Sequence, residues 1–184
     1  MRPALFSLLT LASVEAGPCD IFQSGGTPCV AAYGFTRALY ATYNGPLYQV
    51  MRVSDNTTTD VGLLAPGGVQ DSATQDTFCE NTDCVVTRIY DQSPKANHLS
   101  IAPAGGHVHH GDQPVNASRF KTTLGGKEVY AAWFDGGAGY RNDATQGVAT
   151  GNEEETLYMV TSGTHYNDKV CLCLFLFSLC FSFF

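Results

Sequence analysis

The sequence has few charged residues, and basic residues are the scarcer kind. Lys and Arg number 10 against 17 Asp and Glu, which gives a formal net charge of −7 at pH 7. The basic residues form no patch, so the composition argues against nucleic acid as a partner. Charged residues make up 15 % of the chain, while Gly, Ser, Thr, Asn and Tyr are plentiful. This composition is typical of a secreted, β-rich protein with many turns.

Long runs of a single pattern are also missing. No segment with helical periodicity exceeds a few turns and no repeat is visible, which argues against βαβ units. Short segments with strand character lie between turn formers, at residues 46–53, 84–91, 99–101, 127–135 and 156–162. Residues 70–78 suggest a short helical turn, and residues 30–48 suggest a helical turn followed by a strand. We therefore predict an all-β fold, an antiparallel β-sandwich.

The N-terminus has the pattern of a secretory signal peptide. Arg2 precedes an apolar run at residues 4–14, and Val14 and Ala16 place compact side chains just before a cut ahead of Gly17. A membrane anchor is the alternative, but the run is shorter than the roughly 20 apolar residues that a span needs. We expect residues 1–16 to be removed, and the remainder has the length of about one domain.

The seven cysteines divide into two local pairs and a C-terminal group. The four cysteines outside that group permit three pairings, but their short spacings favour Cys19 with Cys29 and Cys79 with Cys84. A zinc site is the alternative. It requires the four sulfurs to converge from distant segments, and an oxidising compartment disfavours free thiolates. We expect two disulfides and no metal.

Two acceptor sequons for N-glycosylation lie in polar, loop-like segments. They begin at Asn56 (NTT) and at Asn116 (NAS). A third candidate at Asn81 fails because Asp83 stands where a hydroxyl residue is required. We expect glycans at Asn56 and Asn116.

Five segments carry a resemblance to a known family. In order they are GPCDIFQSGGTPCVAAYGFTRALY from residue 17, DTFCENTDCVVTRIYDQS from residue 76, IYDQSPKANHL from residue 89, GYRNDAT from residue 139 and GTHYND from residue 163. With the cysteine pairs and the order of motifs intact over residues 17–168, the chain resembles the N-terminal part of the fungal α-L-arabinofuranosidase B family, glycoside hydrolase family 54.

The resemblance implies a lectin-like or jelly-roll-like catalytic β-sandwich, incomplete in this chain, that an arabinose-binding β-trefoil follows in complete members. It implies a secreted, extracellular enzyme that releases terminal L-arabinofuranosyl groups from arabinan and arabinoxylan with retention of configuration. The implied partner is an arabinose-containing plant cell-wall polysaccharide. We expect no cofactor and no membrane association, and a monomer.

After Asp168 the sequence departs from the family pattern. The family continues into two adjacent cysteines and the sheet that bears its catalytic carboxylates, whereas residues 171–184 contain only Cys, Leu, Phe and Ser. Codons for these four residues are rich in pyrimidines, and those of Val170 and Cys171 can match the start of an intron. We interpret residues 169–184 as intron read-through. A real apolar tail is the alternative, but 15 residues from Val170 are short for a membrane span.

No catalytic residue is assigned within this chain. A retaining glycosidase needs two carboxyl groups about 5–5.5 Å apart, and in the family both lie beyond the resemblance. The three glutamates at residues 153–155 are typical of a solvated turn. Asp91, Asp135 and Asp143 lie at strand ends or in Gly-rich loops, where turn capping is the usual role.

Two other groups suggest binding. Histidines at positions 107, 109 and 110 could hold a metal, but no nearby carboxylate or cysteine completes the ligand set, so an exposed loop is expected. Trp133 could stack on a sugar, but its apolar strand favours the core. A non-catalytic carbohydrate-binding sandwich that uses Trp133 and Tyr140 is the alternative function. A membrane-tethered structural protein is a third, and it depends on the tail alone.

Overall fold

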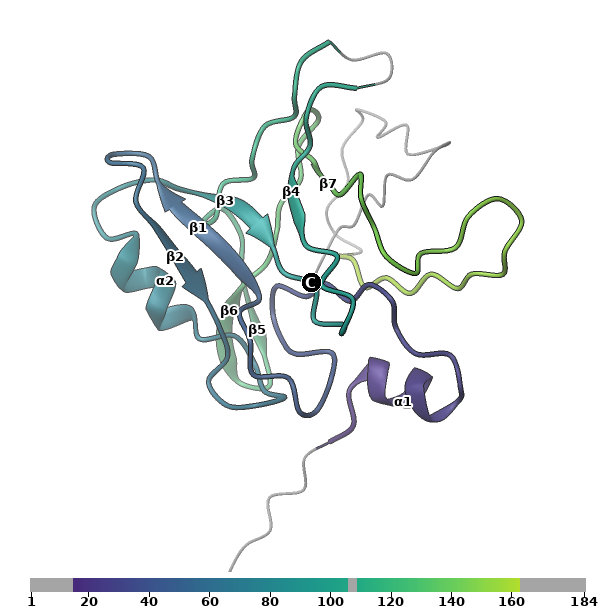
Figure 1. The fold of residues 1–184 in the computed structure, drawn as a ribbon. Coiled ribbons are helices and arrows are strands. Elements are labelled where there is room, and N and C mark those ends of the chain that lie inside the picture. Colours follow the sequence, from purple (N-terminus) through teal and green to yellow (C-terminus); the bar gives the residue numbers. More distant parts are fainter. Residues whose placement is uncertain (1–14, 106–108, 163–184) are drawn as a thin grey trace, which may run out of the picture.

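The computed structural model describes residues 15–105 and 109–162, which fold around an antiparallel sheet (Figure 1). Most of the expected signal peptide and the whole of the aberrant tail lie outside the described residues. The helices and strands of the described part are α1 (Pro18–Ser24), β1 (Tyr48–Arg52), β2 (Thr58–Val61), α2 (Ser72–Phe78), β3 (Cys84–Ile89), β4 (Leu99–Ile101), β5 (Lys121–Leu124), β6 (Lys127–Tyr130) and β7 (Tyr140–Arg141). Neither described helix is long and apolar enough to cross a membrane.

The main sheet has five strands in the order β2-β1-β3-β4-β7, and each neighbouring pair is antiparallel. Tyr48 of β1 lies opposite Val61 of β2 on one side and Ile89 of β3 on the other. The pairing of β1 with β3 shifts between Gln49 and Val50. The extra residue lies on β3, and it lets Val86 and Ile89, three positions apart, both face the core opposite Val50 and Tyr48.

The hydrophobic core forms where strand alternation points large apolar side chains to one face. Phe35, from the loop before β1, stacks on Tyr48 with ring centroids 4.6 Å apart. In the core cluster around Tyr48, the residues no more than 1 % exposed are Leu47, Tyr48, Val50, Val61, Cys84, Val86 and Ile89. Burying each large apolar side chain contributes about 1.5–3 kcal/mol. A one-residue shift in strand pairing would move these side chains from the core face to the solvent face, so it is strongly disfavoured.

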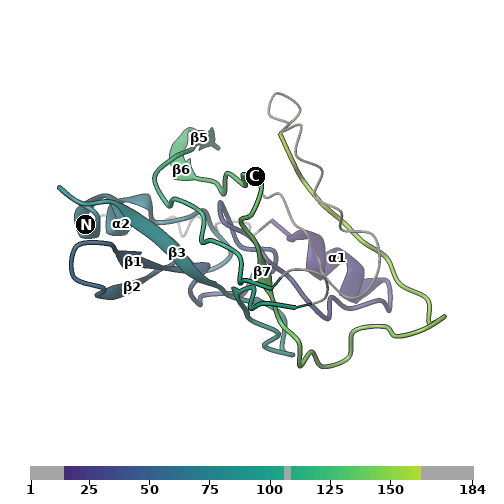
Figure 2. The same cartoon turned by 90° about the horizontal axis from the view of Figure 1, so that it is seen from above.

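The β5–β6 hairpin forms a second layer over one face of the main sheet (Figures 1 and 2). Buried Gln70 joins it to the loop before β1, because its Nε2 donates to the carbonyls of Phe35 at 2.7 Å and Tyr130 at 2.9 Å. The Gln70 Oε1 accepts the Tyr130 N–H at 2.6 Å. The Tyr130 hydroxyl in turn donates to Asp76 of α2.

The predicted all-β, antiparallel class is confirmed, and in the described part the second layer has only two strands. The strands expected at 46–53, 84–91 and 99–101 correspond to β1, β3 and β4, and the turn expected at 70–78 corresponds to α2. The expectation for 127–135 holds only for its first half, because β6 ends at Tyr130.

Other local predictions are wrong. Residues 156–162 form no strand, because no described segment pairs with them, and residues 157–160 are between 46 % and 66 % exposed. Residues 30–47 form a loop. The helix forms earlier, inside the first cysteine loop, where Pro18 occupies the first turn as proline favours. Strands β2, β5 and β7 lie in segments where no strand was expected.

Candidate functional site

The loop after β3 carries a buried carboxylate, Asp91, in the segment where the family resemblance is densest. Asp91 is 3 % exposed. Its Oδ1 accepts the N–H groups of Ala32 at 2.7 Å and Ser93 at 2.8 Å. Its Oδ2 accepts the Ser93 hydroxyl at 2.6 Å and the Asn97 N–H at 2.8 Å. A carboxylate has about four lone-pair sites, so all are occupied and Asp91 acts as a structural acceptor.

Two buried amides extend this arrangement to other segments. Gln92 Oε1 accepts the Leu39 N–H at 2.6 Å. Asn97 Nδ2 donates to the carbonyls of Val30 at 2.8 Å and Gln146 at 3.0 Å, and its Oδ1 accepts the Gln146 N–H at 2.7 Å. We call Asp91, Gln92, Ser93 and Asn97 the Asp91 clamp. It connects the loop before β1, the loop after β3 and the chain at residue 146.

His98 and Tyr33 complete the surroundings of the Asp91 clamp. His98 Nδ1 accepts the Asp91 N–H at 3.0 Å, so this nitrogen carries no proton. Partial burial lowers the pKa of His98, although the nearby Asp91 charge acts in the opposite direction. Burial, with a smaller contribution from Asp91, raises the pKa of Tyr33, whose hydroxyl donates to the Asn97 carbonyl at 2.5 Å. Both groups are therefore neutral and fixed by hydrogen bonds at neutral pH.

The other carboxylates considered from the sequence have local partners at the surface. The glutamates at 153–155 are exposed, and Glu153 accepts the Thr150 N–H at 2.8 Å. Asp143 pairs with Arg141 Nε at 2.5 Å. Asp135 pairs with Arg119. These are the contacts of turns and exposed ion pairs, which contribute about 0–1 kcal/mol each.

The histidine group is only partly described. His107 lies outside the described residues, and His109 and His110 are exposed. Within residues 15–105 and 109–162, no group of three His, Cys, Asp or Glu side chains is arranged to hold a metal ion.

The two aromatic residues considered as sugar contacts lie in different environments. Trp133 is half-buried and outside the core, so its predicted core position is wrong. The reason is that β6 ends before Trp133. The indole ring packs instead against Phe120 and under the Arg119 guanidinium, whose central carbon lies 5.0 Å from the ring centroid. Tyr140 is buried, and its hydroxyl donates to the Val86 carbonyl at 2.7 Å and accepts the Val115 N–H at 2.9 Å. Tyr140 therefore has no surface from which to contact a sugar.

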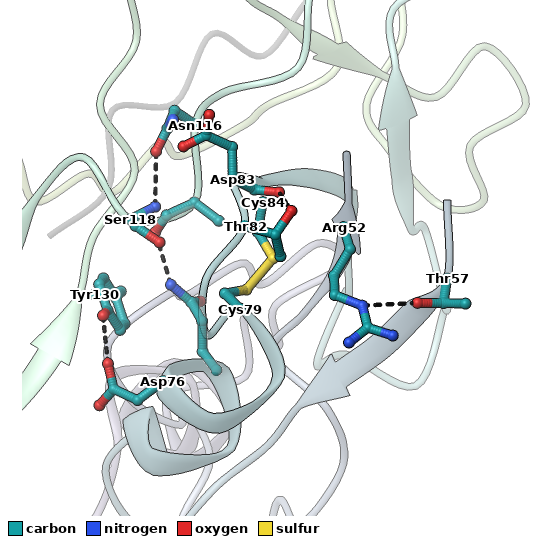
Figure 3. Close-up of a disulfide and its surroundings, with 12 residues drawn as sticks. Arg52, Thr57, Asp76, Cys79, Thr82, Asp83, Cys84, Asn116, Ser118 and Tyr130 are labelled. Atoms are coloured by element: carbon teal, nitrogen blue, oxygen red, sulfur yellow. Dashed lines mark hydrogen bonds between the residues drawn. A yellow bond between two sulfur atoms is a disulfide. The ribbon is translucent and has the colours of Figure 1, made fainter. Parts of the chain in front are cut away.

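Both expected disulfides are present. Cys19–Cys29 closes the loop that contains all of α1 except Pro18, with an S–S distance of 2.13 Å. Cys79–Cys84 joins the end of α2 to the first residue of β3, with an S–S distance of 2.08 Å (Figure 3). With all four sulfurs in disulfides, the zinc alternative is excluded for these cysteines.

Both sequon asparagines are exposed. Asn56 lies in the turn between β1 and β2 with a positive φ of 57°, a conformation that asparagine tolerates. The side chain of Asn116 accepts the Ser118 N–H at 2.9 Å, next to the Cys79–Cys84 disulfide (Figure 3). Both side chains are open to solvent, as modification requires.

The buried glutamines at positions 70 and 75 were not identified from the sequence. Gln75 is fully buried in α2, where it accepts the Tyr48 hydroxyl at 2.6 Å and donates to the Ala117 carbonyl at 2.8 Å. Both lie in a polar stretch that is typical of a surface turn, and no sequence signal separates them from the more exposed polar residues around them.

Comparison with known proteins identifies the same family by a family model and by individual relatives. The family model described as "Alpha-L-arabinofuranosidase B, catalytic" matches residues 18–175. The chain is 52 % identical over 172 residues to the probable α-L-arabinofuranosidase B of Aspergillus flavus, covering 91 % of this chain and 34 % of the relative. It is 53 % identical over 169 residues to the α-L-arabinofuranosidase B of Emericella nidulans, covering 90 % and 33 %.

Solved structures give the same relationship. A crystal structure of an arabinofuranosidase complexed with arabinofuranosyl-α-1,2-xylobiose superposes with a TM-score of 0.72 at 48 % identity, over 74 % of this chain and 29 % of that one. A GH54 α-L-arabinofuranosidase soaked with a cyclic sulfate inhibitor gives the same values. The chain spans about a third of the length of the relatives that it matches.

Proposed function

Because the chain belongs to the family of α-L-arabinofuranosidase B catalytic domains, we propose that it is the N-terminal part of the catalytic domain of a retaining α-L-arabinofuranosidase. The family match over residues 18–175 is the observation that carries this proposal. The proposed substrates are arabinan and arabinoxylan, from which terminal L-arabinofuranosyl groups are released. The arabinofuranosyl-xylobiose bound by a solved relative supports the arabinoxylan part of this proposal.

By itself the chain is inactive in this proposal. The carboxylates considered from the sequence are held in turns, in surface ion pairs or, for Asp91, by four donors. Retaining hydrolysis requires a facing nucleophile and acid/base pair, which the resemblance places in the part of the family that follows residue 168. The relevant unit is therefore the chain together with that part.

The test is hydrolysis of 4-nitrophenyl α-L-arabinofuranoside by two proteins: the chain alone, and residues 17–168 joined to the remainder of the Emericella nidulans relative. We expect no turnover from the first and turnover from the second, with the intact relative as the positive control. Turnover by the chain alone contradicts its inactivity. A soluble, inactive fusion contradicts the family function, and arabinoxylan binding without turnover then favours the carbohydrate-binding alternative.

We further propose that the protein is secreted to the extracellular space, loses residues 1–16 and carries glycans at Asn56 and Asn116. The two disulfides support an oxidising compartment. Treating the secreted chain with a glycosidase specific for N-linked glycans tests the glycans. Asn56→Gln and Asn116→Gln should each remove one step of the mass shift, and a variant that leaves the shift unchanged excludes that site.

For residues 169–184 we keep the proposal of intron read-through. Sequencing cDNA across the codons for residues 168–171 tests it. A message that skips the segment after Lys169 and rejoins a longer reading frame supports the proposal. A message that continues as printed contradicts it, and the apolar tail then belongs to the protein.

A further inference from the structure

The backbone nitrogen of Gly17 lies within hydrogen-bond distance of a carboxylate. It is 2.7 Å from Asp20 Oδ2, and the same oxygen accepts the Ala41 N–H at 2.7 Å. Gly17 is buried, whereas Glu15 and Ala16, directly before it, are exposed. The chain therefore changes from exposed to enclosed at the Ala16–Gly17 peptide bond.

The space around Gly17 admits no side chain. An ideal Cβ at this position would lie 2.2 Å from the Leu39 carbonyl oxygen. That oxygen is fixed because it accepts the Cys19 N–H at 3.0 Å, and Cys19 is held by its disulfide with Cys29. The position of residue 17 is thus fixed by the Asp20 carboxylate, the Leu39 carbonyl and the Cys19–Cys29 disulfide.

We propose that, once residues 1–16 are removed, the α-ammonium group of Gly17 forms an ion pair with Asp20 as part of the fold. One water molecule hydrolyses the Ala16–Gly17 bond. Ala16 leaves with the new carboxylate, and the Gly17 nitrogen becomes an amine that takes up a proton at neutral pH. The inference rests on the proposed secretion of the chain and is independent of glycosidase activity.

The chemistry at this position suits an ammonium group better than an amide. An α-amine has a pKa of about 7.7–8.0 in the absence of neighbours, and a carboxylate at hydrogen-bond distance favours its charged form. A charge-assisted hydrogen bond is roughly twice as strong as a neutral one. Cleavage therefore replaces an amide–carboxylate contact by an ion pair in the same place.

The first test identifies the N-terminus. The full chain is produced with its own leader in a secreting host, and the product, from medium or cell extract, is digested with trypsin and analysed by mass spectrometry. We expect the N-terminal peptide to begin at Gly17 and end at Arg37. A peptide that begins at any other residue overturns the proposal.

The second test examines the ion pair through the rate at which an acetylating reagent modifies the α-amine of peptide 17–37, which contains no lysine. We expect acetylation at least about tenfold slower in the native protein than in urea. Asp20→Asn should remove most of this protection. The matched control, Asp71→Asn at the start of α2, should keep it. Equal rates in native buffer and urea, or protection that survives Asp20→Asn, overturn the proposal.

Discussion

At the scale of single residues, this chain uses its polar side chains mainly to hold backbone in place. Asp91, Gln92 and Asn97 each bond to backbone groups from segments that are distant in sequence. Such groups are stabilising only while every donor and acceptor is paired, because an orphaned buried polar group costs about 1–3 kcal/mol. Substitutions at these positions should therefore affect stability before they affect any chemistry.

Asp91→Asn is the sharpest test of this view. An amide presents one acceptor oxygen and two donor protons to four donors, so at least one buried donor loses its acceptor. We expect a loss of about 1–3 kcal/mol in the free energy of unfolding for each orphaned donor, measured by pulse proteolysis. The control Asp143→Asn, in an exposed pair with Arg141, should cost no more than about 1 kcal/mol. Equal effects of the two substitutions would contradict the structural role of Asp91.

Gly17→Ala tests the close contact at the start of the fold. The new methyl group would lie 2.2 Å from the Leu39 carbonyl oxygen, so the backbone must shift. Overpacking of this kind costs about 1–3 kcal/mol, and thermal unfolding of the fusion of residues 17–168 with the remainder of the Emericella nidulans relative should show a lower Tm. Gly25→Ala is the matched control, because its Cβ meets nothing closer than 3.4 Å. A Tm that falls equally in both variants would show that the contact is not specific.

At the scale of elements, much of the main sheet was predictable and its connections were not. The crowded β-branched residues of β3 and the alternation of β1 are local signals, and both strands form where expected. Strand β7 has two residues and depends on pairing with β4, which no local pattern encodes. Residues 156–162 show the converse, since they have β-propensity but no partner among the described strands. Pairing and buried amides such as Gln70 are tertiary properties, and a local pattern does not contain them.

The loop after β3 should respond to acid through His98. Its pKa is lowered from 6.5 in the folded chain, so as pH falls the unfolded state binds a proton first. Stability is therefore full above about pH 6.5 and decreases as pH falls towards the folded pKa. Below that value His98 also donates from Nδ1 and loses the Asp91 N–H. Hydrogen exchange at the Asp91 amide, corrected for its intrinsic pH dependence, should accelerate below pH 6.5.

Replacing His98 provides the control for this acid response. In His98→Gln the side-chain oxygen can accept the same N–H but does not titrate in this range. The exchange rate of the Asp91 amide should then lose its acceleration below pH 6.5. An acceleration that persists in this variant would assign the response to another group.

At the scale of the whole molecule, the described part leaves an apolar surface open. Residues 157–160 expose four consecutive apolar side chains, and Tyr158 packs edge-on against Phe22, with ring centroids 6.3 Å apart. Extended, apolar and unpaired backbone is a template for association between chains. The chain spans about a third of its relatives, so we expect it to be poorly soluble or retained in the secretory pathway when produced alone.

Charge placed in this segment should reduce that association. We expect the double variant Leu157→Lys and Met159→Lys to raise the monomeric fraction in size-exclusion chromatography, because exposed charge opposes strand pairing. Val53→Lys with Leu64→Lys is the control, since both are single exposed apolar residues elsewhere. Equal improvement in both variants would indicate a general effect of net charge. A soluble wild-type monomer with a sharp cooperative melt would contradict the expectation altogether.

The hydrogen bonds of the Asp91 clamp can form only late in the synthesis of the chain, because they join segments that are distant in sequence. Its bonds to the loop before β1 join residues 53 to 67 positions apart, from Leu39 with Gln92 to Val30 with Asn97. At a translation rate of about 5–20 residues per second, roughly 3–13 s pass between the synthesis of the loop before β1 and the synthesis of its anchoring residues. Both cysteines of the Cys19–Cys29 disulfide, by contrast, emerge together and early. This disulfide can hold the first segment in a compact form during that interval. It can therefore form before the hydrogen bonds of the Asp91 clamp, which complete the fold.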